Sequence, residues 1–312
     1  MSRHLQTLFL LAVMSILFVL PTQAQVTTAS MSGTVMFQDE PVIGATIMAV
    51  HEPSGSNYGT ITNVDGRFSL QGMRTGGPYK VTISYVGYQS SVYTGIMLQL
   101  GETYNINAEL KESSELLDEV VITATKSKFS NEKTGATTNI SASQIAELPT
   151  INRSISDIAR ISPYASGMSF AGGDGRSTNF TIDGANFNNN FGLSDKLPGG
   201  GNPISMDAIE EVQVVVAPFD VRQTNFIGGG INAITKSGTN TFKGTAYAYY
   251  RNQDMRGNRI DGEDLGARAD ESKTTYGFTL GGPIIKNKLF FFANFEQEKT
   301  PGEVIKYRSE ER

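Results

Sequence analysis

The chain has 312 residues, of which 39% are hydrophobic, and this is enough to build the cores of about two domains. Its 31 acidic residues outnumber its 26 basic ones, which argues against a nucleic-acid partner, because nucleic acid requires a basic surface. The absence of cysteine excludes disulfides, thiolate metal sites and a cysteine nucleophile. Only His4 and His51 are present, so we expect no metal centre, no cofactor and no catalytic residues.

The first 24 residues have the build of a secretory signal peptide. Arg3 and His4 precede an apolar run of 13 residues, Leu8 to Leu20, and the small residue Ala24 marks a cleavage point that leaves Gln25 first. The run is short for a membrane span, and a retained N-terminal anchor is the alternative. No later stretch approaches ~18 consecutive apolar residues, so we expect an exported chain without a transmembrane helix.

Residues 26–112 predict an all-β sandwich, because short alternating runs are separated by Gly, Pro and Asp turns. The Asp65-Gly66 pair supplies a hairpin turn that tolerates positive φ. A calcium ligand is the alternative role for Asp65, although a second acid is not nearby. The runs SGTV, PVIGATIMAV, TNVDGRFSL and YKVTISYVGYQS resemble the carboxypeptidase regulatory-like domain, which is Ig-like and non-catalytic and often precedes the plug of outer-membrane receptors. The expected strands are 32–37, 45–50, 59–62, 67–70, 79–86 and 104–110.

The segment 116–126 lies between two domains and contains the run LDEVVITATK. Its residues Val120 to Ala124 are apolar or β-branched, which favours an extended backbone, and the acids Asp118 and Glu119 precede them. An extended apolar segment in a tether is a template for adding a strand to the sheet of a partner. The alternative is that it forms the last strand of the preceding domain.

Residues 130–238 predict an α+β domain with two short helices. Ser141 and Gln144 have the spacing of a capping box for the first helix, and Asn152 or Ser154 can begin the second. The apolar face of the second helix is expected to contain Ile155, Ile158, Ala159 and Ile161. Strands are expected at 177–183, 209–216 and 231–236.

Two stretches of this domain are candidate ligand sites. The glycine runs at 172–175 and 228–230 lack a following Gly-Lys-Ser/Thr and a βαβ unit, so backbone freedom in tight turns is favoured over nucleotide binding. The cluster NFNNN can offer hydrogen bonds to an external ligand, and a plain surface loop is the alternative. The candidate ligand-binding residues are Asn186, Asn188, Asn189 and Asn190.

Four stretches, AELP, NFTIDG, AIEEVQ and GGINAITK, together resemble the plug domain of TonB-dependent outer-membrane transporters. The runs FTIDGANFNNNFGL and PFDVRQTNFIGGGINAITKSGTN are closest to the Oar-like branch of that family. The resemblance implies that 116–126 is a TonB box, which the periplasmic protein TonB grips by strand addition. The implied TonB-binding residues are Leu117, Asp118, Glu119, Val120, Val121, Ile122, Thr123 and Ala124.

Residues 241–312 hold 11 aromatic residues, a density that suits the wall of a membrane β-barrel. Strands are expected at 242–251, 275–283 and 289–296, with a long loop at 252–273 and a short turn at 284–288. A soluble antiparallel sheet is the alternative. Both of the last two strands alternate between two faces. In the second strand, one face carries Tyr276, Phe278 and Leu280, and the other carries Gly277, Thr279 and Gly281. In the third strand, one face carries Leu289, Phe291, Ala293 and Phe295, and the other carries Asn294 and Glu296.

Together these features predict the N-terminal part of an Oar-like TonB-dependent transporter in the outer membrane, which takes up a ligand by energy-coupled transport and is not an enzyme. Three strands cannot close a barrel, so we expect the sequence to continue. The expected partners are TonB with its inner-membrane energising complex, outer-membrane lipid and an external ligand. The alternative is a cell-surface binding or adhesion protein without transport. The expected parts are a signal peptide (1–24), the β-sandwich (26–112), the TonB box (116–126), the plug (130–238) and the first antiparallel barrel strands (241–312).

Overall fold

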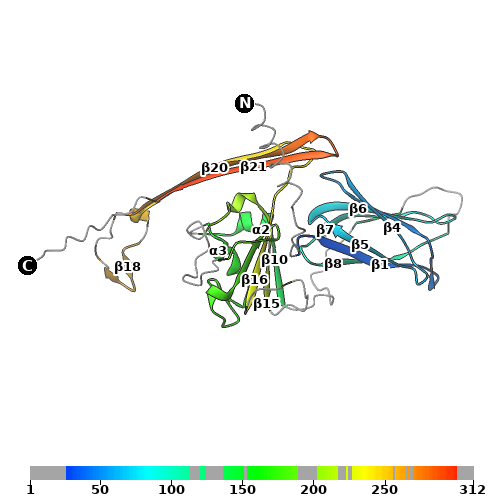
Figure 1. The fold of residues 1–312 in the computed structure, drawn as a ribbon, viewed down its shortest axis with the longest axis horizontal. Coiled ribbons are helices and arrows are strands. Elements are labelled where there is room, and N and C mark those ends of the chain that lie inside the picture. Colours follow the sequence, from blue (N-terminus) through cyan, green and yellow to red (C-terminus); the bar gives the residue numbers. More distant parts are fainter. Residues whose placement is uncertain are drawn as a thin grey trace, which may run out of the picture.

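The structure is a computed structural model that describes residues 26–112, 120–123, 136–150, 153–188, 202–216, 223, 227–255, 257–264, 266 and 270–300. The predicted signal peptide and the alternative helix cap Asn152 lie outside these residues. Three β-rich parts follow one another: a sandwich, an α+β domain, and a long three-stranded sheet that passes over the α+β domain (Figure 1).

The sandwich consists of two sheets. In the first, β2, β1 and β5 are neighbours and β8 pairs with β1 in parallel; the second has the order β4-β3-β6-β7-β9. The strands of the first sheet are β1 (Ala29–Phe37), β2 (Glu40–Pro41), β5 (Arg67–Met73) and β8 (Thr103–Glu109). Those of the second are β3 (Thr46–His51), β4 (Ser56–Ile61), β6 (Gly76–Ser84), β7 (Ser91–Leu98) and β9 (Val120–Thr123).

Alternation along these strands builds the sandwich core. Ile47 in β3 is fully buried whereas its neighbour Met48 is 47% exposed, and Met31 and Tyr79 are fully buried from the other strands. Burying a side chain of this size contributes about 1.5–3 kcal/mol. The predicted turn with positive φ is confirmed, since Gly66 has a φ of +70° that glycine adopts without steric cost. It is not a hairpin, however, because the strands on either side, β4 and β5, belong to different sheets and the turn carries the chain from one sheet to the other.

Strand β7 was not expected from the sequence. Its residues SVYTGIML include Gly95, whose φ is +77°, and the register of β6 against β7 shifts between Tyr93 and Ile96. A bulge of this kind disrupts the alternation on which strand prediction depends. The strand is nevertheless an interior strand of the second sheet, where it lies between β6 and β9.

The α+β domain has a five-stranded sheet of order β10-β15-β16-β13-β14. Apolar residues of its strand β15, Val212 and Val214, pack with Ile145 and Ile155 of the helices in one core. The strands are β10 (Ala136–Ser141), β13 (Asn179–Ile182), β14 (Ala185–Asn186), β15 (Ile209–Val216) and β16 (Gly229–Thr235), and the helices are α2 (Ala142–Glu147) and α3 (Ile155–Ala159). Strand β15 has the predicted bounds, and the predicted strand at 177–183 begins only at Asn179.

Both helices begin where the sequence predicted. The Gln144 side chain accepts a hydrogen bond from the Ser141 N–H at 3.0 Å, and the Ser154 hydroxyl accepts from the Asp157 N–H at 3.3 Å. One prediction is wrong: Ile161 does not join the apolar face of α3 but is 39% exposed. The helix ends at Ala159, so the helical periodicity no longer applies two residues later.

The third part is an antiparallel sheet of order β17-β20-β21, comprising β17 (Lys243–Asn252), β20 (Ser272–Ile285) and β21 (Leu289–Lys299). The predicted alternation is confirmed. Phe278 is 48% exposed and lies opposite Phe295, with the rings 5.9 Å apart, whereas Thr275 and Thr279 are buried on the other face. We refer to these as the aromatic face and the polar face of the sheet.

The remaining short elements are β11 (Ala165–Ser166), β12 (Ser169–Phe170), β18 (Arg259–Ile260) and β19 (Glu263–Asp264), and the 3-10 turns η1 (Gly175–Ser177), η2 (Met206–Ala208) and η3 (Gln253–Met255). Among the described residues, none of the helices has the length and apolar character required to cross a membrane.

Candidate functional site

The middle of the predicted TonB box, Val120–Thr123, forms strand β9 on the sandwich. It pairs in parallel with the first half of β7, with Ser91 opposite Val120 and Thr94 opposite Thr123, and it is the last strand in the order of its sheet. The segment therefore occupies the place that the alternative interpretation gave it, at the edge of the preceding domain. Its binding to TonB stays a prediction, and Leu117, Asp118, Glu119 and Ala124 lie outside the described residues.

The asparagine cluster stabilises its own hairpin. The Asn188 amide oxygen accepts from the Phe180 N–H at 2.6 Å, and its NH₂ group donates to Asn179 at 2.8 Å. Asn186 accepts from the Asn188 N–H at 2.7 Å. These bonds use much of the hydrogen-bonding capacity of the Asn186 and Asn188 side chains. Asn189 and Asn190 lie outside the described residues.

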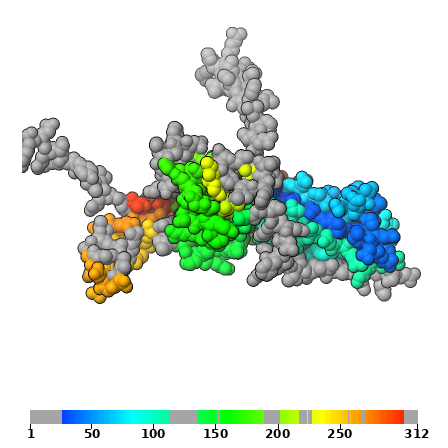
Figure 2. Space-filling view, turned by 90° about the horizontal axis from the view of Figure 1, so that it is seen from below, coloured from blue at the N-terminus to red at the C-terminus, as the bar shows by residue number. Residues whose placement is uncertain are grey.

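A polar anchor joins the sandwich to the outer face of the sheet in the α+β domain. Both carboxylate oxygens of Glu211 accept from the Leu100 N–H at 3.1 Å. The Leu100 carbonyl accepts from Gln213 at 2.6 Å and from Asn139 at 3.0 Å. Glu211 is only 5% exposed and Gln213 only 2%, so these bonds form out of water, where an unmade one is costly. Figure 2 shows the two domains as adjoining bodies.

A second contact joins the sandwich to the three-stranded sheet. The Asn240 N–H donates to the Pro53 carbonyl at 2.8 Å. The Asn240 side chain accepts from the Asn287 N–H at 2.8 Å and donates to the Asn287 side chain at 2.7 Å. Asn287 lies in the short turn between β20 and β21, so this turn is held against the sandwich.

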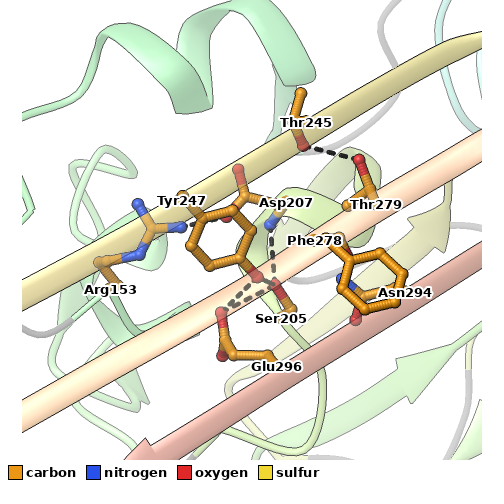
Figure 3. Close-up of polar contacts among 9 residues, drawn as sticks. All are labelled: Arg153, Ser205, Asp207, Thr245, Tyr247, Phe278, Thr279, Asn294 and Glu296. Carbon is orange, nitrogen blue, oxygen red and sulfur yellow. Dashed lines mark hydrogen bonds and ion pairs between the residues drawn. The ribbon is translucent and has the colours of Figure 1, made fainter.

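The α+β domain is seated on the polar face of the three-stranded sheet by a network of five residues (Figure 3). The Tyr247 hydroxyl donates to Glu296 at 2.8 Å and lies 2.9 Å from the Ser205 hydroxyl, which is itself 3.0 Å from Glu296. Arg153 pairs with Asp207, and its guanidinium lies 5.4 Å from the centre of the Tyr247 ring. Hydrogen bonds to charged groups of this kind contribute about 1.5–3 kcal/mol each.

A hollow of about 400 Å³ lies beside this network, between the α+β domain and the sheet. Arg251 and Lys273 contribute positive charge, but each has an acidic neighbour, Glu271 at 3.7 Å and Glu298 at 2.8 Å respectively. The hollow is lined by Ala146, Leu148, Pro149, Thr150, Arg153, Tyr249, Tyr250, Arg251, Lys273 and Thr275. Its charges are largely compensated, so it is not built for one strongly charged ligand.

His51 has a structural environment. Its ring is buried against Tyr79, with the ring centres 4.9 Å apart, and its Nδ1 lies 2.6 Å from the Ser54 hydroxyl. Burial, followed by the positive charge of Arg74, lowers the pKa of His51 from its usual 6.5 to about 4. Among the described residues, no group of three or more His, Asp or Glu side chains could hold a metal ion.

Sequence reasoning missed the residues that join the three parts. Glu211 occurs within the run AIEEVQ, where it reads as an ordinary polar position on a solvated sheet face. Arg153, Ser205 and Tyr247 come from segments far apart in the chain. The alternation of β17 and β21 does, however, place Tyr247 and Glu296 on the polar face, which is the signal that could have identified them.

Comparison with known proteins agrees with this architecture. Residues 30–111 match the carboxypeptidase regulatory-like domain, and residues 234–303 match the outer membrane beta barrel domain. The TonB-dependent transporter Oar of Myxococcus xanthus is 24% identical over 275 residues, which are 82% of this chain and 25% of Oar. The TonB-dependent receptor SusC of Bacteroides thetaiotaomicron is 31% identical over 113 residues, which are 36% of this chain and 10% of SusC.

Two solved structures also resemble the chain. The siderophore receptor PirA from Acinetobacter baumannii aligns with a TM-score of 0.40 at 23% identity, over 53% of this chain and 24% of PirA. The outer membrane transporter YddB from Escherichia coli aligns with a TM-score of 0.42 at 19% identity, over 53% of this chain and 26% of YddB.

The matched domains define a class: an outer-membrane β-barrel protein that carries a carboxypeptidase regulatory-like sandwich. Within that class, the chain is homologous to the TonB-dependent transporter Oar, which confirms the resemblance described from the sequence. The chain spans about a quarter of the length of Oar. The relatives are named as transporters and receptors, not as enzymes.

Proposed function

We propose that this chain serves energy-coupled uptake of an external ligand through the outer membrane. The signal peptide at 1–24 directs export and is removed, residues 130–238 form the plug, and the three-stranded sheet belongs to the membrane wall. Homology to transporters and receptors supports a role in the outer membrane. A membrane wall also accounts for a sheet with aromatic side chains on one face and threonines on the other.

The observation that carries the proposal is the position of the plug candidate. The α+β domain is seated on the polar face of the sheet through Tyr247 and Glu296, while Phe278 and Phe295 point away from it. A domain held in this way inside a barrel blocks passage until it is moved. The segment that precedes it in the chain, Leu117 to Ala124, is then the point at which force is applied.

TonB is the proposed source of that force. TonB adds one of its own strands beside the segment Leu117 to Ala124. Val120, Val121 and Ile122 contribute main-chain hydrogen bonds to this pairing. Asp118 and Glu119 add charge complementarity. The ligand binds on the outer side, at the asparagine cluster 186–190 and at the long loop between β17 and β20.

The test is calorimetry between the periplasmic domain of TonB from the same cell and a peptide spanning residues 113–128. Replacing Val121 with proline removes a backbone donor and fixes φ, so binding should weaken by a few kcal/mol. Val121→Thr is the matched control, because it keeps the donor and the β-branched shape. Equal binding by all three peptides would exclude strand addition. No binding by any of them would favour a display or adhesion protein.

A further inference from the structure

Among the described residues, no strand pairs with the outer edge of β9. One edge of β9 is paired with β7 over the four positions from Ser91 to Thr94. In the sheet order of the described residues β9 is terminal, so its other edge faces away from the sandwich. The unpaired N–H and C=O groups of such an edge are a template for a further strand.

Strand β9 pairs with the straight part of β7. Among the described residues this pairing runs from Ser91 to Thr94, and the next residue of β7, Gly95, has a φ of +77° at the point where the register of β6 against β7 shifts. The bulge turns the rest of β7 out of line with an incoming strand. The residues that pair with the straight part of β7, Val120 to Thr123, are all β-branched and favour an extended backbone.

Strand β9 follows closely in the sequence after residues that are fixed beside β7. Lys111 accepts from the Gln89 N–H at 2.8 Å, and Glu112 forms a bridge with Tyr88, so the chain is fixed beside the start of β7. Val120, which lies opposite Ser91, follows eight positions after Glu112. So short a separation in the sequence gives a high effective concentration, which favours pairing of β9 with β7.

From this geometry we infer that the sandwich presents β9 to TonB: β7 holds Val120 to Thr123 extended, and TonB pairs with the outer edge of β9 as the next strand of the same sheet. We call this arrangement the platform. The inference rests on the proposed function and adds how the segment is presented. A preordered strand loses less conformational freedom on binding than a free peptide does. The pairing with β7 is short and parallel, which is the less stable geometry per residue, so a pull can then detach β9 and transmit force to the α+β domain.

The test uses the full chain in detergent, with cysteines placed in a protein that has none of its own. Thr94→Cys with Thr123→Cys joins two opposed residues, and neighbouring strands lie about 4.8 Å apart, within the Cα separation that a disulfide spans. Thr94→Cys with Val120→Cys is the matched control, because these positions are out of register by three residues. The first pair should oxidise readily and the control pair poorly. Equal oxidation of the two pairs would overturn the inference.

Calorimetry with the periplasmic domain of TonB then separates the possible outcomes. The oxidised Thr94–Thr123 chain should bind within about twofold of its reduced form, and the free peptide 113–128 should bind at least about tenfold more weakly than either. If the peptide binds but oxidation abolishes binding by the chain, β9 must leave β7 first; the platform is then wrong and the proposed function stands. If neither the peptide nor the chain binds, both are overturned.

Discussion

Replacing Glu211 with alanine should release the sandwich from the α+β domain. The two Glu211 oxygens are the acceptors of the Leu100 N–H, at 3.1 Å, and Glu211 is buried, with 5% exposure. Removing the acceptor leaves a buried N–H without its partner, which costs about 1–3 kcal/mol. The docking equilibrium should therefore weaken by about 5- to 150-fold, because each factor of ten corresponds to about 1.4 kcal/mol.

Hydrogen exchange at the Leu100 amide measures this change directly, because exchange requires the anchor to open. Protection at Leu100 should fall by the same factor in Glu211→Ala and by less in Glu211→Gln, since the amide keeps an acceptor oxygen. The neighbouring Gly101 amide is an internal reference, because it donates to Thr28 within the sandwich at 3.1 Å. Its protection should not change.

Glu147→Ala is the matched control for charge. Glu147 lies on the exposed surface of the same domain, so its replacement removes one negative charge without touching Leu100. If Glu211→Ala and Glu147→Ala leave the same protection at Leu100, the anchor contributes nothing to docking and the reasoning is refuted.

Three further outcomes are expected. The contribution of His51 to the stability of the sandwich should be complete above pH 6.5 and fall by up to about 3 kcal/mol as the pH falls to 4. The cause is that His51 takes up a proton in the unfolded state but not when buried, where its pKa is about 4. Urea midpoints measured against pH should show this loss of stability, and His51→Gln should reduce it. Tyr247→Phe removes the hydroxyl that contacts Ser205 and Glu296 and should weaken the contact between the α+β domain and the sheet by about 1–2 kcal/mol, seen as faster proteolysis. Tyr276→Phe is the control and should not have this effect, because the Tyr276 hydroxyl lies on the aromatic face and donates to Gln297 within the sheet. N-terminal sequencing of the membrane-derived protein should begin at or beside Gln25, and a mature chain that begins at Met1 would exclude cleavage.

The local pattern of apolar and polar residues was enough to predict the helices and strands whose two faces lie in different environments. Strand β20 alternates Phe278 and Leu280 with Thr279, and β15 has the predicted bounds because its β-branched residues favour a strand. Helix α3 was found through Ser154, but its end was misplaced because the pattern continued to Ile161 beyond the helix. Strand β7 was missed because the positive φ of Gly95 interrupts the period.

Contacts between the three parts could not be predicted in the same way. The polar groups of Glu211 and Gln213 have the pattern of a solvated sheet face, and only the tertiary arrangement places the Leu100 backbone over them. The location of β9 illustrates the same limit. A β-branched run such as Val120 to Thr123 predicts a strand, but strand propensity does not identify the sheet that the strand joins.

The contact made by Asn240 has a consequence for rotational freedom. A domain attached to its surroundings at one point can rotate in every direction, but a domain attached at two separated points can rotate only about the axis that joins them. The sandwich is attached at Leu100 to the α+β domain and at Pro53, through Asn240, to the turn of the three-stranded sheet. The sandwich, and β9 with it, is therefore restricted by these contacts to rotation about that one axis.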